Sequence, residues 1–169
     1  LATAIAETPG LRCPGYGSLY EASVRGVVGQ QVSTRAARAV LAGIARATAR
    51  DHPPVFPDAP SLAVLQDSCF PMPGRRRDTL RAVCALASSR SDRLDLETLA
   101  TLRGVGPWTL AMVAMRGTGH LDILPIGDLG LDKAWAALAG EGVSLRDHAE
   151  QWRPWRSYAA NLLWRSLSP

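Results

Sequence analysis

The sequence Leu102-Arg-Gly-Val-Gly-Pro-Trp-Thr109 decides the fold of this chain. A short helix is expected to end where this stretch begins. Pro107 then opens a second helix, at a position where the amide that proline lacks has no helical partner anyway. Gly104 and Gly106 let the main chain turn sharply and approach another group closely. Because the first amides of a helix point outward and favour phosphate, the stretch predicts a phosphate-binding helical hairpin over about residues 96–117.

Asp128 is the candidate catalytic carboxylate. It follows Pro125-Ile126-Gly127 and precedes an apolar helix, where aspartate is also a common cap. The two roles are compatible, because a capping carboxylate is held rigidly with one oxygen free. Such a carboxylate stabilises the positive charge that develops on a sugar as its base leaves, or it activates water. Asp122 and Asp132 are the alternatives, although Asp132 lies one helical turn later and favours a surface role.

Two of the five tryptophans are candidates for a base-binding pocket. Core packing accounts for most tryptophans, but Trp108 stands beside the hairpin. Trp164 comes nine positions after Trp155 on the last predicted helix, about half a turn away in phase, so the two face differently. We expect Trp164 to line a cleft. Electron-rich rings suit a flipped, positively charged base through stacking and cation–π attraction.

The charge balance is mildly basic. The formal net charge is +4 and the sequence pI is about 9.4, which suits a polyanionic partner. Lys133 is the only lysine, and a GC-rich genome explains the arginine bias equally well. Arg75, Arg76 and Arg77 begin a predicted helix, where positive charge opposes the helix dipole. That cost favours a phosphate partner, while a solvated surface is the equal alternative.

Cysteine, histidine and hydropathy patterns exclude several other classes. The three cysteines have no metal-ligand spacing and form no disulfide framework, which predicts a reducing interior. His52, His120 and His148 also lack ligand spacing. There is no membrane span and no signal peptide in this sequence, so we expect a cytoplasmic protein. The chain begins without Met, which is typical of a fragment or processed protein.

Helical periodicity dominates, and the sequence predicts an all-α fold over residues 1–169 as one domain. Residues 1–17 are expected to form a lead-in, and the proline-rich residues 51–60 a loop. Helices are expected after the caps Ser18 and Ser33, over 61–67, from Arg75, over 95–102 with Asp95 as cap, over 107–117, from Asp128 to Leu138, from Ser144, and from Pro154 to Leu167.

With these residues in place, the chain resembles the helix-hairpin-helix DNA glycosylase superfamily and, within it, the AlkA-type DNA-3-methyladenine glycosylase II. The resemblance covers nearly the whole chain. The last of its blocks is particularly specific to the AlkA type. The blocks are residues 9–15 (PGLRCPG), 28–33 (VGQQVS), 102–109 (LRGVGPWT), 127–131 (GDLGL) and 150–158 (EQWRPWRSY).

The resemblance implies a two-lobed helical fold with the active-site cleft between the lobes. It implies a monofunctional hydrolase that excises alkylated purines such as 3-methyladenine from double-stranded DNA in base excision repair. It also implies a monomer associated with the bacterial nucleoid, with no membrane partner and no required cofactor. Asp128 is then catalytic. Trp108 and Trp164 line the base pocket, with Met112 where AlkA has an aromatic wall.

The resemblance also implies the DNA contacts. Gln31, just after Gln30, is expected to plug the gap left by the flipped nucleotide. A structural Na⁺ or K⁺ is expected at the hairpin, held by the main-chain carbonyls of Ala100, Leu102 and Val105. The residues expected to contact DNA are Gln30, Gln31, Gly104, Gly106, Thr109 and Arg75.

The sequence departs from the family in informative ways. Trp108 stands where some relatives carry a catalytic lysine, so strand-cutting lyase chemistry is not expected. An iron–sulfur cluster, which needs four clustered cysteines, is excluded. The β-rich N-terminal domain of the family is absent from this chain, and an Ada-like fusion partner is one expectation for a longer parent. Two alternatives stay open: a non-catalytic helix-hairpin-helix DNA-binding module, and a glycosylase for deaminated or oxidised bases.

Overall fold

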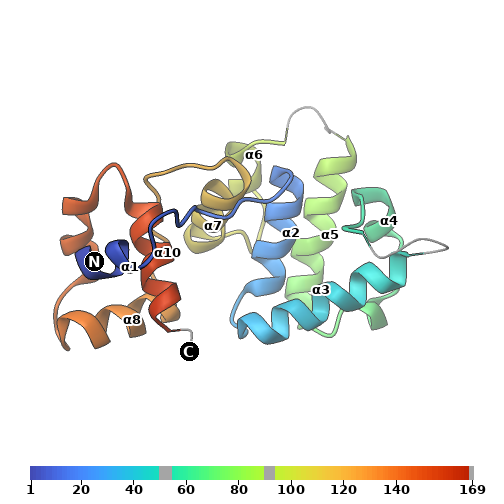
Figure 1. Cartoon of the computed structure of the whole chain (residues 1–169). Coiled ribbons are helices and arrows are strands. Elements are labelled where there is room, and N and C mark those ends of the chain that lie inside the picture. The colour runs from blue at the N-terminus through green and yellow to red at the C-terminus, as the bar shows by residue number, and fades with distance from the viewer. Residues whose placement is uncertain (50–54, 90–93, 168–169) are drawn as a thin grey trace.

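The computed structural model describes residues 1–49, 55–89 and 94–167, and within these ranges it contains helices and no strand (Figure 1). The all-α prediction is confirmed. The α-helices are α1 (Ala2–Glu7), α2 (Leu19–Gly29), α3 (Thr34–Thr48), α4 (Ala59–Ala63), α5 (Gly74–Ser89), α6 (Leu96–Ala100), α7 (Pro107–Gly117), α8 (Leu129–Ala139), α9 (Leu145–His148) and α10 (Arg156–Ser166), and the 3₁₀ turns are η1 (Asp67–Cys69) and η2 (Ala149–Trp152).

Short polar side chains begin most of these helices. The Ser18 hydroxyl accepts a hydrogen bond from the Glu21 N–H before α2 (3.1 Å). A cap of this kind satisfies an amide that has no partner inside the helix. The predicted caps are therefore confirmed, and Asp58 adds one that was not predicted. The remaining capping side chains are Ser33, Asp58, Asp95, Asp128 and Ser144.

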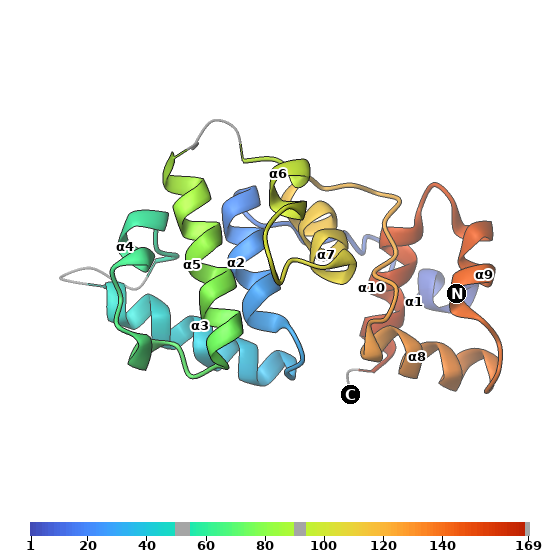
Figure 2. The same cartoon turned by 180° about the vertical axis from the view of Figure 1, so that it is seen from behind.

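Two apolar clusters form the core, with α7 between them. The first cluster joins α2, α3, α4 and α5, and the second joins α8, α9 and α10. The buried Val113 of α7 belongs to the first cluster, and the buried Met115 belongs to the second. This is why α7 is apolar nearly all round. Figures 1 and 2 show the two groups of helices on either side of α7, as the two-lobed prediction requires.

Small residues bring α2 and α7 close together. A Cβ on Gly26 would lie 3.3 Å from Cγ2 of Thr109, and one on Gly117 would lie 2.9 Å from Cβ of Ala22. Real Cβ contacts at the second distance essentially do not occur, so a side chain at residue 117 would push the helices apart. Close packing along α2 fixes the direction of α7, and with it the direction of the hairpin amides.

Some boundaries differ from the predictions. Residues 2–7 form α1, although no helix was expected in the lead-in. The helix expected over 61–67 is α4, which begins earlier because Asp58 caps it. The last helix begins at Arg156 rather than at Pro154, with the exposed Trp155 at its N-cap. The predicted loop over 51–60 is non-helical at 55–58, while 51–54, including His52, lie outside the described residues.

Candidate active site

The hairpin joins α6 to α7 through a tight turn. The Val105 N–H donates to the Leu102 carbonyl (3.0 Å), and Gly104 has a φ of +90°, a conformation that glycine adopts without strain. Gly106 is the N-cap of α7 with a φ of −94°, and a Cβ built there would meet no atom within 4 Å. The turn therefore needs glycine at residue 104, whereas residue 106 borders open space at the start of α7.

Side chains from two other helices hold this turn from behind. The Thr79 hydroxyl of α5 donates to the Arg103 carbonyl (3.0 Å). The Gln30 amide, at the end of α2, donates to the Gly104 carbonyl (2.8 Å). A Cβ on Gly104 would collide with the Thr79 hydroxyl. Since Thr79 and Gln30 both donate to hairpin carbonyls, these two side chains hold the turn without occupying its N–H groups.

The predicted DNA contacts near the hairpin have different surroundings. Gln30 also donates to the Thr109 hydroxyl (2.9 Å), and Thr109 is only 3% exposed. The Thr109 side chain is therefore packed against α2, whereas its main-chain N–H lies in the first turn of α7, and the contact of Thr109 with DNA stays a prediction. Gln31 is exposed and has a φ of +54°, which is uncommon for a residue other than glycine. It lies at the bend between α2 and α3, with its side chain free to project.

Arg75 lies close to the hairpin. It is exposed in the first turn of α5, and its carbonyl (2.9 Å from Oγ1 of Thr79) shares the Thr79 O–H with the Arg103 carbonyl of the hairpin. Arg77 differs, because it donates to the Met72 carbonyl (2.9 Å) and pairs with Asp67 (3.5 Å). Of these two arginines, Arg75 is the one whose position suits a phosphate near the hairpin.

Asp128 is the centre of the site, and three N–H groups from three helices donate to its carboxylate. Oδ1 accepts from the Leu131 main chain (2.9 Å) and from Nε1 of Trp164 (2.9 Å). Oδ2 accepts from Nε1 of Trp108 (2.9 Å). The two indoles come from α7 and α10, so the carboxylate joins elements of both core clusters. Asp128 is both the predicted cap and the residue beside both predicted pocket tryptophans.

Gly130 makes room for this group, and the sequence analysis missed it. A Cβ on Gly130 would lie 3.0 Å from Oδ1 of Asp128 and 3.3 Å from Cδ1 of Trp164. A Cβ on Gly29 would make only an ordinary contact of 3.9 Å with the Trp108 ring, so the site does not require glycine there. Glycine in the first turn of a helix, two residues after a capping aspartate, was the available signal for Gly130. Met112, the third predicted pocket residue, lies one turn after Trp108 on α7 and is half-buried.

The alternative carboxylates have other roles. Asp122 accepts hydrogen bonds from Nη1 of Arg153 (2.6 Å) and Nε of Arg156 (2.6 Å), and Glu150 accepts from the same two arginines. The hydrogen bonds from Arg156, together with the charge of Arg153, hold the pKa of Asp122 below its ordinary value. Asp132 is exposed on α8. Asp122 therefore anchors the loop that leads to Asp128.

The main chain of this loop is fixed as well. The Ser157 hydroxyl of α10 donates to the His120 carbonyl (2.7 Å) and accepts from the Ile123 N–H (3.0 Å). The Ser157 N–H donates to the Leu121 carbonyl (2.9 Å). The loop between α7 and α8 is thus fastened to the start of α10, the helix that carries Trp164.

The predicted cation site consists of main-chain oxygens. The carbonyls of Ala100, Leu102 and Val105 belong to α6 and the hairpin turn, and oxygen is the donor that hard monovalent cations prefer. The Leu102 carbonyl already accepts one hydrogen bond from Val105, which leaves it a second lone pair. Main-chain oxygen is thus the kind of donor that Na⁺ or K⁺ takes, and the ion at this turn stays a prediction. Within the described ranges, no three His, Cys, Asp or Glu residues gather in a way that could hold a metal.

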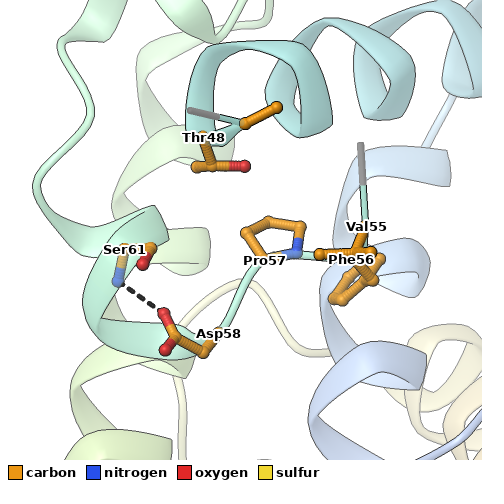
Figure 3. A pocket seen from close by; sticks show the side chains of 7 residues that line it. Thr48, Val55, Phe56, Pro57, Asp58 and Ser61 are labelled. Atoms are coloured by element: carbon orange, nitrogen blue, oxygen red, sulfur yellow. Dashed lines mark hydrogen bonds between the residues drawn. The ribbon is translucent and has the colours of Figure 1, made fainter. Parts of the chain in front are cut away.

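A separate hollow of about 250 Å³ lies between the end of α3 and the start of α4 (Figure 3). Thr48, Phe56 and Ser61 are among its lining residues, and Asp58 caps α4 at its edge. Figure 1 places this region at the opposite end of the molecule from α8. It is not part of the Asp128 site.

Comparisons of sequence find glycosylase relatives, although no protein-family model matches the chain. A Mycobacterium tuberculosis protein named as a bifunctional transcriptional activator/DNA repair enzyme AlkA is 35% identical over 184 residues, covering 99% of this chain and 37% of the relative. DNA-3-methyladenine glycosylase 2 of Escherichia coli is 29% identical over 175 residues, covering 94% of this chain and 61% of the relative. The chain thus spans less than two thirds of either relative. None of its described helices is long and apolar enough to cross a bilayer.

Solved structures show the same fold. The Schizosaccharomyces pombe 3-methyladenine DNA glycosylase, in complex with abasic DNA, matches with a TM-score of 0.79 and 21% identity, over 97% of this chain and 87% of that one. The Archaeoglobus fulgidus 3-methyladenine DNA glycosylase matches with a TM-score of 0.78 and 19% identity, over 96% of this chain and 63% of that one. The Clostridium acetobutylicum 8-oxoguanine glycosylase/lyase, in complex with double-stranded DNA, has a TM-score of 0.78 and 16% identity, over 96% and 63%.

Proposed function

Because this chain belongs to the helix-hairpin-helix DNA glycosylase superfamily, of the AlkA type, we propose that it removes alkylated purines such as 3-methyladenine from double-stranded DNA by hydrolysing the N-glycosidic bond. This reaction begins base excision repair. One observation carries the proposal: the Asp128 carboxylate is fixed by N–H donors from three helices, directly beside the hairpin.

The hairpin binds the DNA backbone in this proposal. Amides at the start of α7 face a phosphate near Gly106, where the structure leaves open space. Arg75 supplies a second phosphate contact from the adjacent start of α5, and the exposed Gln31 fills the gap left by the flipped nucleotide. Gln30 positions the hairpin through its bonds to Gly104 and Thr109, and its contact with DNA stays a prediction. Such contacts hold DNA without reading its sequence.

Asp128 acts on the sugar. An alkylated purine is already cationic, so the glycosidic bond breaks with its electron pair moving to the base, which leaves neutral, and positive charge develops on the deoxyribose. A fixed carboxylate stabilises that charge without reorganising. Oδ2 accepts only the Trp108 bond among the hydrogen bonds of the described residues, so it retains a lone pair for the sugar or for water. Water then adds to the sugar carbon and releases a proton, which gives an intact strand with an abasic site.

The base stacks on tryptophan rings. Trp108 and Trp164 are both half-buried and turn their N–H edges toward Asp128. The same two indoles therefore stack on the base and donate hydrogen bonds to the carboxylate. Met112 adds an apolar, flexible wall one turn along α7, which suits bases of several shapes. No lysine amine stands at residue 108 to attack the sugar, which supports hydrolysis without strand cutting.

The proposal also covers a bound ion, the oligomeric state and the location of the protein. A monovalent cation held by the carbonyls of Ala100, Leu102 and Val105 would add positive charge beside the bound phosphate. We propose a monomer acting on nucleoid DNA in the bacterial cytoplasm. A non-catalytic DNA-binding module is disfavoured by the three donors gathered on Asp128, since such a module has no use for an oriented carboxylate.

The decisive experiment measures base release from methylated duplex DNA. Asp128→Asn keeps the size and the capping oxygen but removes the charge, so we expect 3-methyladenine release to fall by about 10²–10³-fold with duplex binding retained. Borohydride added during turnover should trap no protein–DNA adduct. Near-normal turnover by this variant would refute the role of Asp128. An adduct that disappears in Lys133→Ala would refute the monofunctional reaction.

A further inference from the structure

A cation lies over the face of one of the two indoles that donate to Asp128. The guanidinium carbon of Arg116, in the last turn of α7, is 5.4 Å from the centroid of the Trp164 ring, within the range of a cation–π contact. Nε1 of the same ring donates to Oδ1 of Asp128 (2.9 Å). Arg116 is therefore one ring away from the candidate catalytic carboxylate.

Main-chain groups of the segment before α2 hold Arg116 in this place. Its Nη1 donates to the Pro14 carbonyl (2.9 Å), and its own carbonyl accepts from the Tyr16 N–H (2.7 Å). The segment is held against α10 as well, because the Asn161 amide donates to Sγ of Cys13 (3.2 Å). Residues 13–16 are thus bound to both α7 and α10, and the Pro14 carbonyl holds the guanidinium over Trp164.

Keeping this charge here is costly. Burial lowers the pKa of Arg116 from its ordinary high value, although arginine stays charged. No carboxylate within the described ranges forms an ion pair with it, so carbonyl and ring contacts are what compensate its lost hydration. A buried cation whose lost hydration is only partly replaced by protein contacts lowers the stability of the folded protein. A neutral side chain of the same length would fill the space more cheaply if packing were the only requirement.

We infer that Arg116 is a positioning residue for base excision, acting through Trp164. It covers one face of the indole and holds the ring in the orientation that brings its N–H to Asp128. The inference rests on the proposed function. It assigns a role to a residue that touches neither the base nor the sugar.

The charge of Arg116 has two consequences for the indole. A cation over the ring draws π-electron density toward itself, which makes the indole N–H a stronger donor to Asp128. The same cation reduces the attraction of the opposite face for a second cation. Stacking on Trp164 then depends less on the charge of the base than stacking on a bare tryptophan would. Arg116 therefore supports the chemical step while moderating the preference for cationic over neutral bases.

The test uses Arg116→Met, which keeps the length and loses the charge, and Arg116→Lys, which keeps a cation over the ring. Arg81→Met is the matched control. Arg81 lies 5.5 Å from the Phe70 centroid and donates to the Ala63 carbonyl (2.8 Å), on α5 in the other core cluster. The measurements are single-turnover rates and KM for release of 3-methyladenine, a cationic lesion, and hypoxanthine, a neutral one, together with Tm.

We expect Arg116→Met to lower the rate on both lesions by about tenfold, with KM for the cationic lesion falling relative to that for the neutral lesion. Arg116→Lys should restore most of the rate. Arg81→Met should lower Tm and leave the rate unchanged. If Arg116→Met lowers Tm alone, as Arg81→Met does, or if lysine restores nothing, the inference is wrong.

A second readout separates this inference from the proposed function. In protein labelled with ¹⁵N at the indoles, the Trp164 N–H signal, assigned by Trp164→Phe, reports the bond to Asp128 whether or not the protein releases a base. Arg116→Met should make this N–H exchange faster by about tenfold, and Arg116→Lys should not. Wild-type protein that releases neither base refutes the proposed function. An indole signal that is unchanged in Arg116→Met refutes the positioning role.

Discussion

The hairpin and the Asp128 loop flank the same indoles, but different forces hold them. The hairpin is held by neutral side chains, because Gln30 at the end of α2 and Thr79 of α5 donate hydrogen bonds to its carbonyls. An ion network at the start of α10 fastens the loop, through Arg156 and Asp122. A phosphate-binding turn must keep its amides free and tolerate a polyanion, which neutral bonds to carbonyls allow. A loop that positions a carboxylate must resist being pulled toward DNA or the substrate, which a charged network achieves.

The largest effect is expected where the loop anchor is most buried. Arg156 and Asp122 have only 16% and 15% of their side chains exposed, and Arg156 donates to both the side chain and the main chain of Asp122. Arg156→Met leaves the carboxylate poorly paired, so we expect the free energy of unfolding to fall by about 3 kcal/mol, measured in urea. Base release should also fall at temperatures where the variant is folded, because the loop sets the position of Asp128.

Arg146→Met is the control for this prediction, since Arg146 is exposed on α9. It should change neither stability nor base release. If Arg156→Met behaved like Arg146→Met, the network would have no anchoring role and the contrast between the two regions would disappear.

The next effect is expected at the hairpin. Gly104→Ala places a Cβ against the Thr79 hydroxyl at a φ of +90°, so we expect a loss of about 2 kcal/mol in the free energy of unfolding. Because the hairpin must move, affinity for duplex DNA of any sequence should fall, and its dependence on salt should become weaker. Chemical denaturation and a salt titration of DNA binding measure these two effects.

Gly106→Ala is the matched variant. Its Cβ enters open space at an ordinary φ of −94°, so stability should change little. DNA affinity should fall nonetheless, because the methyl group stands where a phosphate approaches. Equal destabilisation by the two substitutions would contradict the assignment of Gly104 as the turn residue and Gly106 as the phosphate side.

A smaller effect is expected from the bond that holds the hairpin from behind. Thr79→Val keeps the shape but loses the bonds to Arg103 and Arg75, which should cost about 1 kcal/mol. DNA binding should weaken as well, although Thr79 is buried and touches no DNA. Ser23→Ala removes only a bond within α2, to the Leu19 carbonyl, and should lower stability without weakening DNA binding. Equal DNA affinities in the two variants would show that Thr79 does not position the hairpin.

Local patterns predicted much of this structure. Capping residues marked the starts of α2, α3, α6, α8 and α9, because a cap acts on amides only two or three residues away. Asp128 and the two indoles were also predicted, from a cap, a hairpin and the phase of one helix. What brings them together is a set of contacts 20 and 36 residues apart, from Trp108 and Trp164, and no local pattern records such contacts.

The residues that the sequence did not predict also depend on contacts between distant parts of the chain. Gly130 matters because α10 passes beside it, and Arg116 because both Trp164 and Pro14 come within its reach. The contact of Gln30 with the hairpin was not predicted, since nothing in the sequence shows that the hairpin, 74 residues away, lies within its reach. These roles depend on tertiary contacts, which composition and periodicity do not encode.

The smallest effect is expected in the pH dependence of Tm, because the ion network of the loop titrates and the neutral hydrogen bonds of the hairpin do not. The Glu150 carboxylate accepts hydrogen bonds from Arg153 and Arg156, and the Arg153 contact is the main cause that holds the pKa of Glu150 below its ordinary value. A carboxyl group whose pKa is lower in the folded state stabilises the fold above its unfolded pKa of ~4.3, and this contribution is lost as pH falls through the folded value. Glu150→Gln should therefore lower Tm slightly at neutral pH, with a gap to the wild type that closes on acidification. Glu141→Gln, at an exposed carboxylate between α8 and α9, should show no such gap. A gap for Glu150→Gln that stayed constant down to pH values well below 4 would mean that packing, rather than charge, fastens this end of the loop.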